Sequence, residues 1–139
     1  MFGVRTAAVT AVALLLAVAL FQLALAAGVP WGSAAYGGDA AAADGSLSAS
    51  LRASSGVAVL ILGLAAWIVL ARGGVVTAGR LDRRLVLALT WVIVAMMALN
   101  TLANATSSSD VERWLMGTVA VALVALCAVV VLHGGESAE

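Results

Sequence analysis

Four long apolar segments, separated by three short polar ones, account for most of this 139-residue chain. Each segment is close to the ~17–25 residues that an α-helix needs to cross the hydrocarbon core of a bilayer. The pattern therefore predicts an all-α fold, a bundle of four transmembrane helices. The expected spans are Thr6–Ala27, Ala53–Ala71, Leu85–Leu102 and Trp114–Leu132.

The composition favours a membrane over water as the surrounding medium. Hydrophobic residues make up 64% of the chain and charged residues 10%, whereas a soluble domain carries roughly 25% charged residues. In water, so apolar a chain would expose large hydrophobic patches and aggregate. We expect one domain, residues 1–139, with membrane lipids as its surroundings. The net charge is zero, which argues against nucleic acid as a partner.

All seven basic residues are arginines, and their distribution predicts the orientation of the chain. Connections rich in Arg and Lys remain in the cytoplasm. The N-terminus and residues 72–84 hold five arginines, whereas the first and third connections hold only Arg52 and Arg113. We therefore expect both termini and the second connection to be cytoplasmic. The lack of lysine, with abundant Ala, Val and Gly, is typical of a GC-rich bacterial genome, so the expected location is a bacterial cytoplasmic (inner) membrane.

The N-terminal segment has an alternative interpretation. Arg5, the apolar run after it and the residues 24–26 resemble a secretory signal peptide with an A-x-A cleavage site. The apolar run is longer than the ~7–15 residues of a signal-peptide hydrophobic region. We therefore expect the first helix to be retained, whereas cleavage would leave three spans and an exterior N-terminus.

Turn and capping residues mark the expected helix ends. Gly28 and Pro30 are expected to end the first helix, because proline lacks a backbone donor and disfavours helical geometry in the residue before it. Ser54 and Ser55 are candidate N-caps of the second helix, and Asp82 is the candidate for the third.

The first connection, residues 28–52, is the one long polar segment. It is rich in Gly, Ala, Ser and Asp, a composition that favours flexibility. Trp31 and Tyr36 stand among turn residues in its first part and predict a structured lip at the membrane surface. Trp91, by contrast, lies deep in the third span, where we expect it to pack between helices.

No Asp, Glu, Lys, Arg or His lies well inside an expected span. Ion-coupled transporters, proton relays and voltage sensors place such groups at membrane depth. Zinc sites need clusters of His, Asp, Glu or Cys, and a serine nucleophile needs a base. The single cysteine, Cys127, lies in an apolar span, where a thiol acts as a small hydrophobic group. We therefore expect no enzymatic activity, and no catalytic residue, cofactor or metal.

Neutral polar residues inside the spans give one candidate site. Gln22 lies 15 residues beyond Ala7 and Asn100 lies 15 residues beyond Leu85, so each is roughly 22 Å above the cytoplasmic edge at ~1.5 Å per residue. Thr118 enters from the opposite side, so all three can share the outer leaflet, and Asn104 follows Asn100 on the same helical face. We expect a polar vestibule that opens outward beneath the first connection. The candidate ligand-binding residues are Gln22, Trp31, Tyr36, Asn100, Asn104 and Thr118.

Two functions follow from this pattern. The first is a non-enzymatic structural or accessory membrane component that packs against lipid, a second copy of the chain or a partner membrane protein. The second is a binder or carrier of a lipid or small molecule that uses the vestibule. Interhelical hydrogen bonds, worth only ~0.6 kcal/mol each on average, would explain the same polar residues without a ligand.

The residues around the end of the first span resemble a known group of proteins. Residues 21–32 read FQLALAAGVPWG, and Tyr36-Gly37-Gly38 follows. This run is similar to a Gly-x-Pro-Trp-Gly element after the first helix in a family of small bacterial four-span membrane proteins. Similar proteins often have prolines where this chain has Ser48-Ala49-Ser50. The resemblance implies the four-span topology and no particular activity. It draws attention to Gln22, Pro30, Trp31, Asn100 and Arg113.

Overall fold

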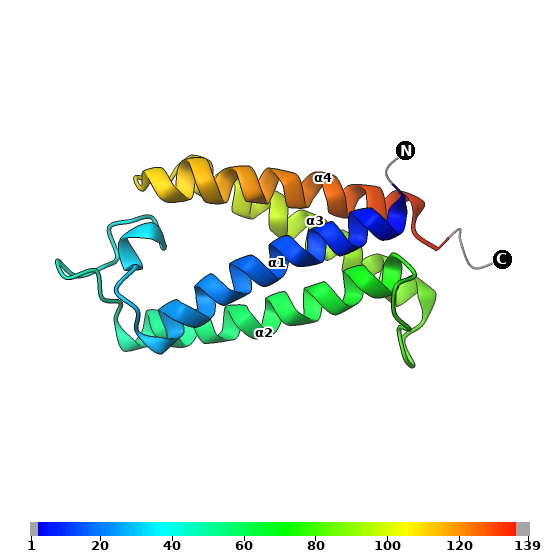
Figure 1. The fold of residues 1–139 in the computed structure, drawn as a ribbon, viewed down its shortest axis with the longest axis horizontal. Helices are drawn as coiled ribbons and strands as arrows, with labels where there is room; N and C mark the ends of the chain where they lie inside the picture. Colours follow the sequence, from blue (N-terminus) through cyan, green and yellow to red (C-terminus); the bar gives the residue numbers. More distant parts are fainter. Residues whose placement is uncertain (1–2, 136–139) are drawn as a thin grey trace.

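The computed structural model describes residues 3–135, which form four long helices and no strand (Figure 1). The expected all-α four-helix fold is confirmed. The single domain expected over residues 1–139 also includes residues 1–2 and 136–139, which lie outside the described part. The elements are α1 (Val4–Ala27), the 3-10 turn η1 (Gly32–Ala34), α2 (Ala49–Arg72), α3 (Arg83–Ala105), the π-helical turn η2 (Val111–Met116) and α4 (Gly117–His133).

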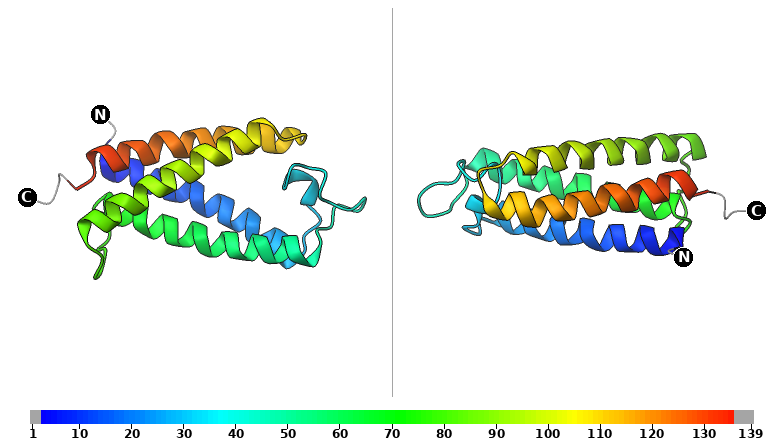
Figure 2. Two further views of the ribbon diagram at one scale, coloured as in Figure 1. Left: turned by 180° about the vertical axis from the view of Figure 1, so that it is seen from behind. Right: turned by 90° about the horizontal axis from the view of Figure 1, so that it is seen from above.

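Each helix runs antiparallel to its neighbour in the sequence (Figures 1 and 2). The pairs α1–α2 and α3–α4 pack most extensively, and α1 also packs along α4. The α1–α2 and α3–α4 connections lie together at one end of the bundle, which we call the loop end. The α2–α3 connection and the beginning and end of the described chain lie at the other, the arginine end.

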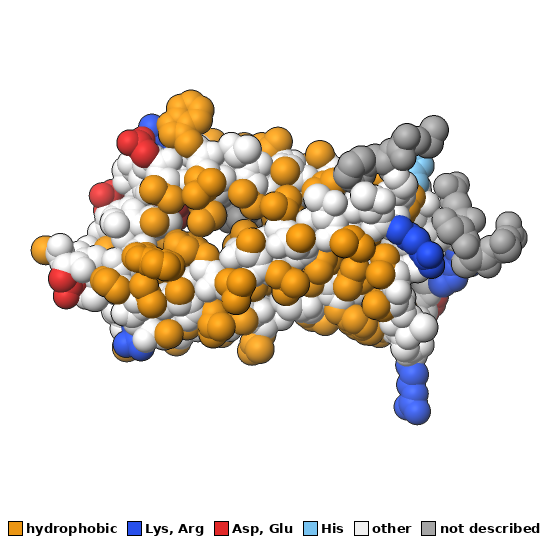
Figure 3. Space-filling model, in the orientation of Figure 1, with side chains coloured by type: hydrophobic (Ala, Val, Ile, Leu, Met, Phe, Trp, Pro, Cys, Tyr) orange, Lys and Arg blue, Asp and Glu red, His pale blue; other side chains and the backbone are white. Residues whose placement is uncertain are grey.

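The helices have the length and surface of membrane spans. The four apolar helices hold 23 or 24 residues, with η2 and α4 forming one span from Val111 to His133. At ~1.5 Å per residue they exceed the ~30 Å thickness of a bilayer's hydrocarbon core. Large side chains such as Leu60 (74% exposed) and Leu99 (68% exposed) point away from the bundle, and apolar groups spread along its length (Figure 3). The chain is a multi-pass membrane protein.

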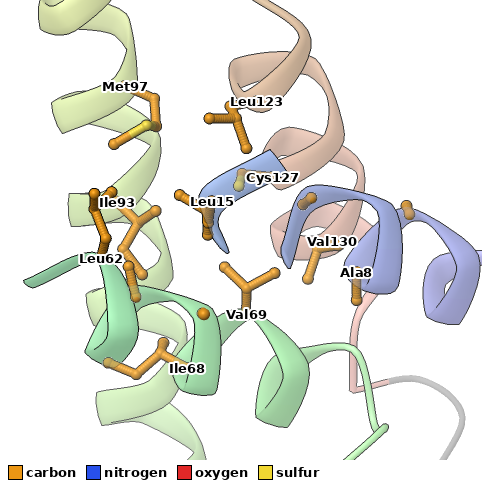
Figure 4. Packing of buried hydrophobic residues seen from close by; sticks show 14 of the residues in the cluster. Ala8, Leu15, Leu62, Ile68, Val69, Ile93, Met97, Leu123, Cys127 and Val130 are labelled. Carbon is orange, nitrogen blue, oxygen red and sulfur yellow. The ribbon is translucent and has the colours of Figure 1, made fainter. Parts of the chain in front are cut away.

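The core forms where the four helices face one another. Leu15 of α1, Val69 of α2, Ile93 of α3 and Cys127 of α4 belong to one buried cluster (Figure 4). All four are less than one-tenth exposed. Small side chains let α1 and α2 approach closely, as at Gly73, where an added Cβ would lie 2.5 Å from the Cβ of Ala8. This packing fixes how the helix ends are placed relative to one another.

The helices α1, α2 and α3 begin two to four residues before their expected spans, and the fourth span begins at Val111, three residues early. Gly28 ends α1 in the left-handed conformation (φ +96°), and the Asp82 carboxylate caps α3, both as predicted. The predicted caps of α2 are wrong. Ser48 caps that helix by accepting a hydrogen bond from the Leu51 amide, and Ser54 lies inside the helix, where its hydroxyl donates to the Ser50 carbonyl.

The expectation for Trp91 is also wrong. Its side chain is 48% exposed and faces outward from α3. A helix in lipid is apolar on its buried and on its exposed side, so periodicity does not indicate which face a tryptophan takes. Trp91 therefore contributes to the lipid-facing surface and not to the helix interface.

Charges divide unequally between the two ends of the described chain (Figure 3). Five arginines and one aspartate lie at the arginine end: Arg5, Arg72, Arg80, Arg83, Arg84 and Asp82. Four carboxylates and two arginines lie at the loop end: Asp39, Asp44, Asp110, Glu112, Arg52 and Arg113. The bundle is thus basic at one end and acidic at the other.

Candidate functional site

A cavity of about 460 Å³ opens at the loop end, between α1, the α1–α2 connection, α3 and η2. We call it the loop-end cavity. It lies where the α1–α2 pair and the α3–α4 pair diverge (Figures 1 and 2). Its volume is within the ~300–1,000 Å³ range of small-molecule sites. The polar part of its lining comes from Gln22, Tyr36, Asn100, Asn104, Thr106, Ser107 and Glu112.

The structure brings four of the six sequence-predicted residues to this cavity. Gln22 lines it from α1, Tyr36 from the first connection, and Asn100 with Asn104 from α3. Asn104 is buried, whereas Asn100 is exposed. The i, i+4 spacing of the two asparagines places them on one face of α3, as expected.

Trp31 and Thr118 do not line the cavity. The Trp31 ring stacks on Phe21, with ring centroids 6.4 Å apart, and remains 52% exposed. Thr118 is exposed, and its hydroxyl donates to the Trp114 carbonyl (2.5 Å) one turn earlier in the fourth span. The residues 34–37, and not Trp31, therefore cover the cavity.

Gln22 presents a hydrogen-bond acceptor that no described residue uses. Its Oε1 atom has less than 1 Å² of exposed surface and receives no hydrogen bond from residues 3–135. Leaving a buried acceptor unpaired costs about 1–3 kcal/mol. Because the oxygen itself has almost no exposed surface, the Gln22 amide has to turn toward the cavity before a ligand there can donate to it and remove that cost.

Glu112, at the start of the fourth span, is the cavity's one charged group. Its Oε2 atom accepts from the Gly37 amide (2.9 Å) and from the hydroxyl of the buried Ser107. The other carboxylate oxygen accepts no hydrogen bond from residues 3–135. The sequence analysis predicted no binding role for Glu112. The serine run 107–109, which ends three residues before Glu112, could have indicated a local hydrogen bond, because serine hydroxyls bond to nearby polar groups.

The Glu112 carboxylate also joins two connections that are distant in the sequence. Gly37 belongs to the first connection, and Ser107 belongs to the third. Arg113 holds the third connection by donating to the Ser107 carbonyl (2.5 Å), and Ser108 donates to the Gly37 carbonyl (2.5 Å). Residues 34–37, which cover the cavity and which we call its roof, are therefore hydrogen-bonded to the third connection on its side.

The first connection is folded over its whole length, which its flexible composition did not predict. Leu25, Ala35 and Leu47 form a small buried cluster beneath it. The Gly32 amide donates to the Gly45 carbonyl (2.9 Å), and an added Cβ at Gly32 would lie only 2.6 Å from Leu47 Cδ2. Glycine is thus required at position 32 for the two halves of the connection to meet.

The chemistry of the lining limits what the cavity can accept. The amides of Gln22 and the asparagines offer both donors and acceptors, Glu112 offers acceptors alone, and no arginine contributes. Val18, Phe21 and Met116 supply apolar surface. Within residues 3–135 no three His, Cys, Asp or Glu side chains are grouped so that they could hold a metal ion. The arrangement suits a neutral or cationic group that donates hydrogen bonds.

Comparison with models of known protein families, with curated proteins and with solved structures finds no match to this chain. The interpretation of the cavity therefore depends on its own geometry.

Proposed function

We propose that this protein is a non-enzymatic component of a bacterial cytoplasmic membrane that binds a small polar molecule or a lipid headgroup in the loop-end cavity. The unpaired Gln22 acceptor is the observation that carries the proposal. It lies in a cavity of ligand size, beside a carboxylate that keeps one oxygen available. A side chain that served only to join helices would have its acceptor paired with a neighbouring helix.

The proposed orientation places the loop end outside the cytoplasm. The charge division supports it, because the arginine end carries five of the seven arginines and the positive-inside rule keeps such segments in the cytoplasm. In this orientation the cavity opens at the level of the outer leaflet. Lipid headgroups and molecules from the exterior both reach it there.

The ligand we propose donates hydrogen bonds and is neutral or positively charged. Phosphatidylethanolamine is a suitable probe, because its ammonium group would meet Glu112 and Gln22. Its acyl chains could leave the cavity along Val18 and Met116 toward the surrounding lipid. Sequence alone placed packing before binding as the function, and the unpaired acceptor is the observation that supports binding.

Native mass spectrometry of the full-length protein in mild detergent tests the proposal. We expect retained phosphatidylethanolamine on the wild type, and at least about tenfold weaker retention by Gln22→Ala and Asn100→Ala. Thr118→Ala is the matched control, because Thr118 is a polar residue of the same leaflet outside the cavity. Equal retention by all variants, together with lowered thermal stability in the first two, would favour a purely structural or accessory role.

A further inference from the structure

A second cavity, of about 680 Å³, opens at the arginine end of the bundle. We call it the arginine-end cavity. It lies between the start of α1, the end of α2, the α2–α3 connection and the start of α3. Arg5, Arg72 and Arg83 contribute to its lining from three different helices, and the described lining contains no carboxylate. We propose that it binds a phosphate-type anion, either the headgroup of an anionic phospholipid or free phosphate.

Backbone carbonyls hold the three guanidinium groups around the cavity. Arg5 Nη2 donates to the Gly74 carbonyl (2.9 Å), Arg72 Nη2 to the Val131 carbonyl (2.9 Å) and Arg83 Nη2 to the Gly135 carbonyl (2.5 Å). A guanidinium has five N–H donors in a planar fork that matches phosphate oxygens. Within residues 3–135, the guanidinium groups of Arg5 and Arg83 each donate to one carbonyl. Their other N–H groups therefore remain to donate to an anion.

Two guanidinium groups lie close together. A Cβ placed on Gly135 would be 2.5 Å from Arg72 Nη1 and 3.3 Å from Arg83 Nη2, so both groups surround one point. An anion beside two positive groups this close would lower their mutual repulsion.

Among residues 3–135, the helix ends add no net charge at the arginine end. Two helices begin and two helices end at the arginine end, so their partial charges of about ±0.5 cancel. The Asp82 carboxylate accepts from the Arg84 amide (2.9 Å) and is outside the lining. Arg80 and Arg84 also lie at the arginine end, outside the lining.

The rest of the lining suits a phospholipid in particular. Ala71, Leu81 and Val86 give the cavity an apolar side next to its arginines. Basic pockets between transmembrane helices are known to bind anionic headgroups. An acyl glycerol portion would contact the apolar side while the phosphate meets the guanidinium groups.

Native mass spectrometry with phosphatidylglycerol and phosphatidylcholine tests this proposal on the full-length protein. We expect selective retention of phosphatidylglycerol, weakened at least about tenfold by Arg83→Gln and by Arg5→Gln. Arg84→Gln is the matched control: it removes the same charge from the next residue, which does not line the cavity. We expect it to change retention less than about twofold. Equal losses in Arg83→Gln and Arg84→Gln would overturn the proposal, and so would no selectivity between the lipids together with no stabilisation by inorganic phosphate.

A second measurement separates the two sources of the anion. If inorganic phosphate raises the unfolding temperature of delipidated wild type but not of Arg83→Gln, the cavity takes free phosphate. Selective retention of phosphatidylglycerol without stabilisation by inorganic phosphate would assign the cavity to the lipid headgroup. The C-terminal residues Glu136 and Glu139 could compete as anions. If phosphatidylglycerol is retained only after both are changed to Gln, the proposal is overturned. The C-terminal carboxylates, and not a lipid or phosphate, would then be the anions that the cavity binds.

Discussion

The hydroxyl oxygen of Tyr36 lies 2.8 Å from that of Ser55, a side chain with no exposed surface. The Tyr36 hydroxyl is also 3.0 Å from the Leu51 carbonyl, to which it donates. Tyr36 is the one non-glycine residue with positive φ (+54°) among residues 3–135. These contacts tie the roof of the loop-end cavity to the first turns of α2.

Tyr36→Phe removes both contacts and leaves the buried Ser55 hydroxyl with one partner fewer. We expect the free energy of unfolding to fall by about 1–2 kcal/mol, measured by thermal unfolding in detergent. Ser55→Ala should lower it as well, and the double variant should lose less than the sum of the two. Fully additive losses would show that the two hydroxyls do not interact.

Glu112→Ala leaves the Gly37 amide and the Ser107 hydroxyl without their shared acceptor. We expect a loss of about 2–3 kcal/mol, and of about 1 kcal/mol for Glu112→Gln, which keeps an acceptor but no charge. Asp110→Asn is the control. Its exposed partner Arg113 is 3.9 Å away, and such surface pairs contribute ~0–1 kcal/mol. Equal effects of Glu112→Ala and Asp110→Asn would contradict the bridging role of Glu112.

Gln22→Leu replaces a buried, unpaired acceptor by an apolar side chain of similar size. In the delipidated protein we expect the unfolding temperature to stay constant or to rise, because the cost of the unpaired oxygen disappears. The same variant should lose the stabilisation that phosphatidylethanolamine gives to the wild type. A clear drop in stability without lipid would instead mean that Gln22 bonds to a neighbouring helix.

Gly32→Ala places a methyl group 2.6 Å from Leu47 Cδ2 and 2.8 Å from the Gly45 carbonyl oxygen. We expect a loss of about 1–3 kcal/mol and faster proteolysis of the first connection. Gly63→Ala in α2 is the control, because an added Cβ meets nothing there and alanine favours a helix by ~1 kcal/mol. Similar results for the two variants would contradict the close approach at Gly32.

The sequence was sufficient to predict the helices and several of their ends. Long apolar runs identify spans, and Gly28 and Asp82 act through local backbone geometry that depends on few other residues. The cap of α2 was harder to predict, because a serine can either cap a helix or bond back inside it. Ser48 and Ser54 do these two things six residues apart.

The candidate site could be predicted only in part. Depth along a span placed Gln22, Asn100 and Thr118 in one leaflet, and helical spacing added Asn104. The structure brings Gln22, Asn100 and Asn104 to the loop-end cavity. Depth does not give direction around a helix axis, so Thr118 faces away. The contribution of Glu112 depends on contacts with Gly37, 75 residues earlier in the chain. Such a contact has no local signal in the sequence.

Cysteine labelling in intact cells is the most direct test of a four-span bundle with its arginine end in the cytoplasm. Asp44 and Arg80 are exposed at opposite ends, and the native Cys127 is buried in the core. We expect a membrane-impermeant maleimide to label Asp44→Cys in intact cells and Arg80→Cys only after permeabilisation. Labelling of Arg80→Cys in intact cells, with Asp44→Cys protected, would contradict the orientation, and labelling of both would contradict the four-span topology.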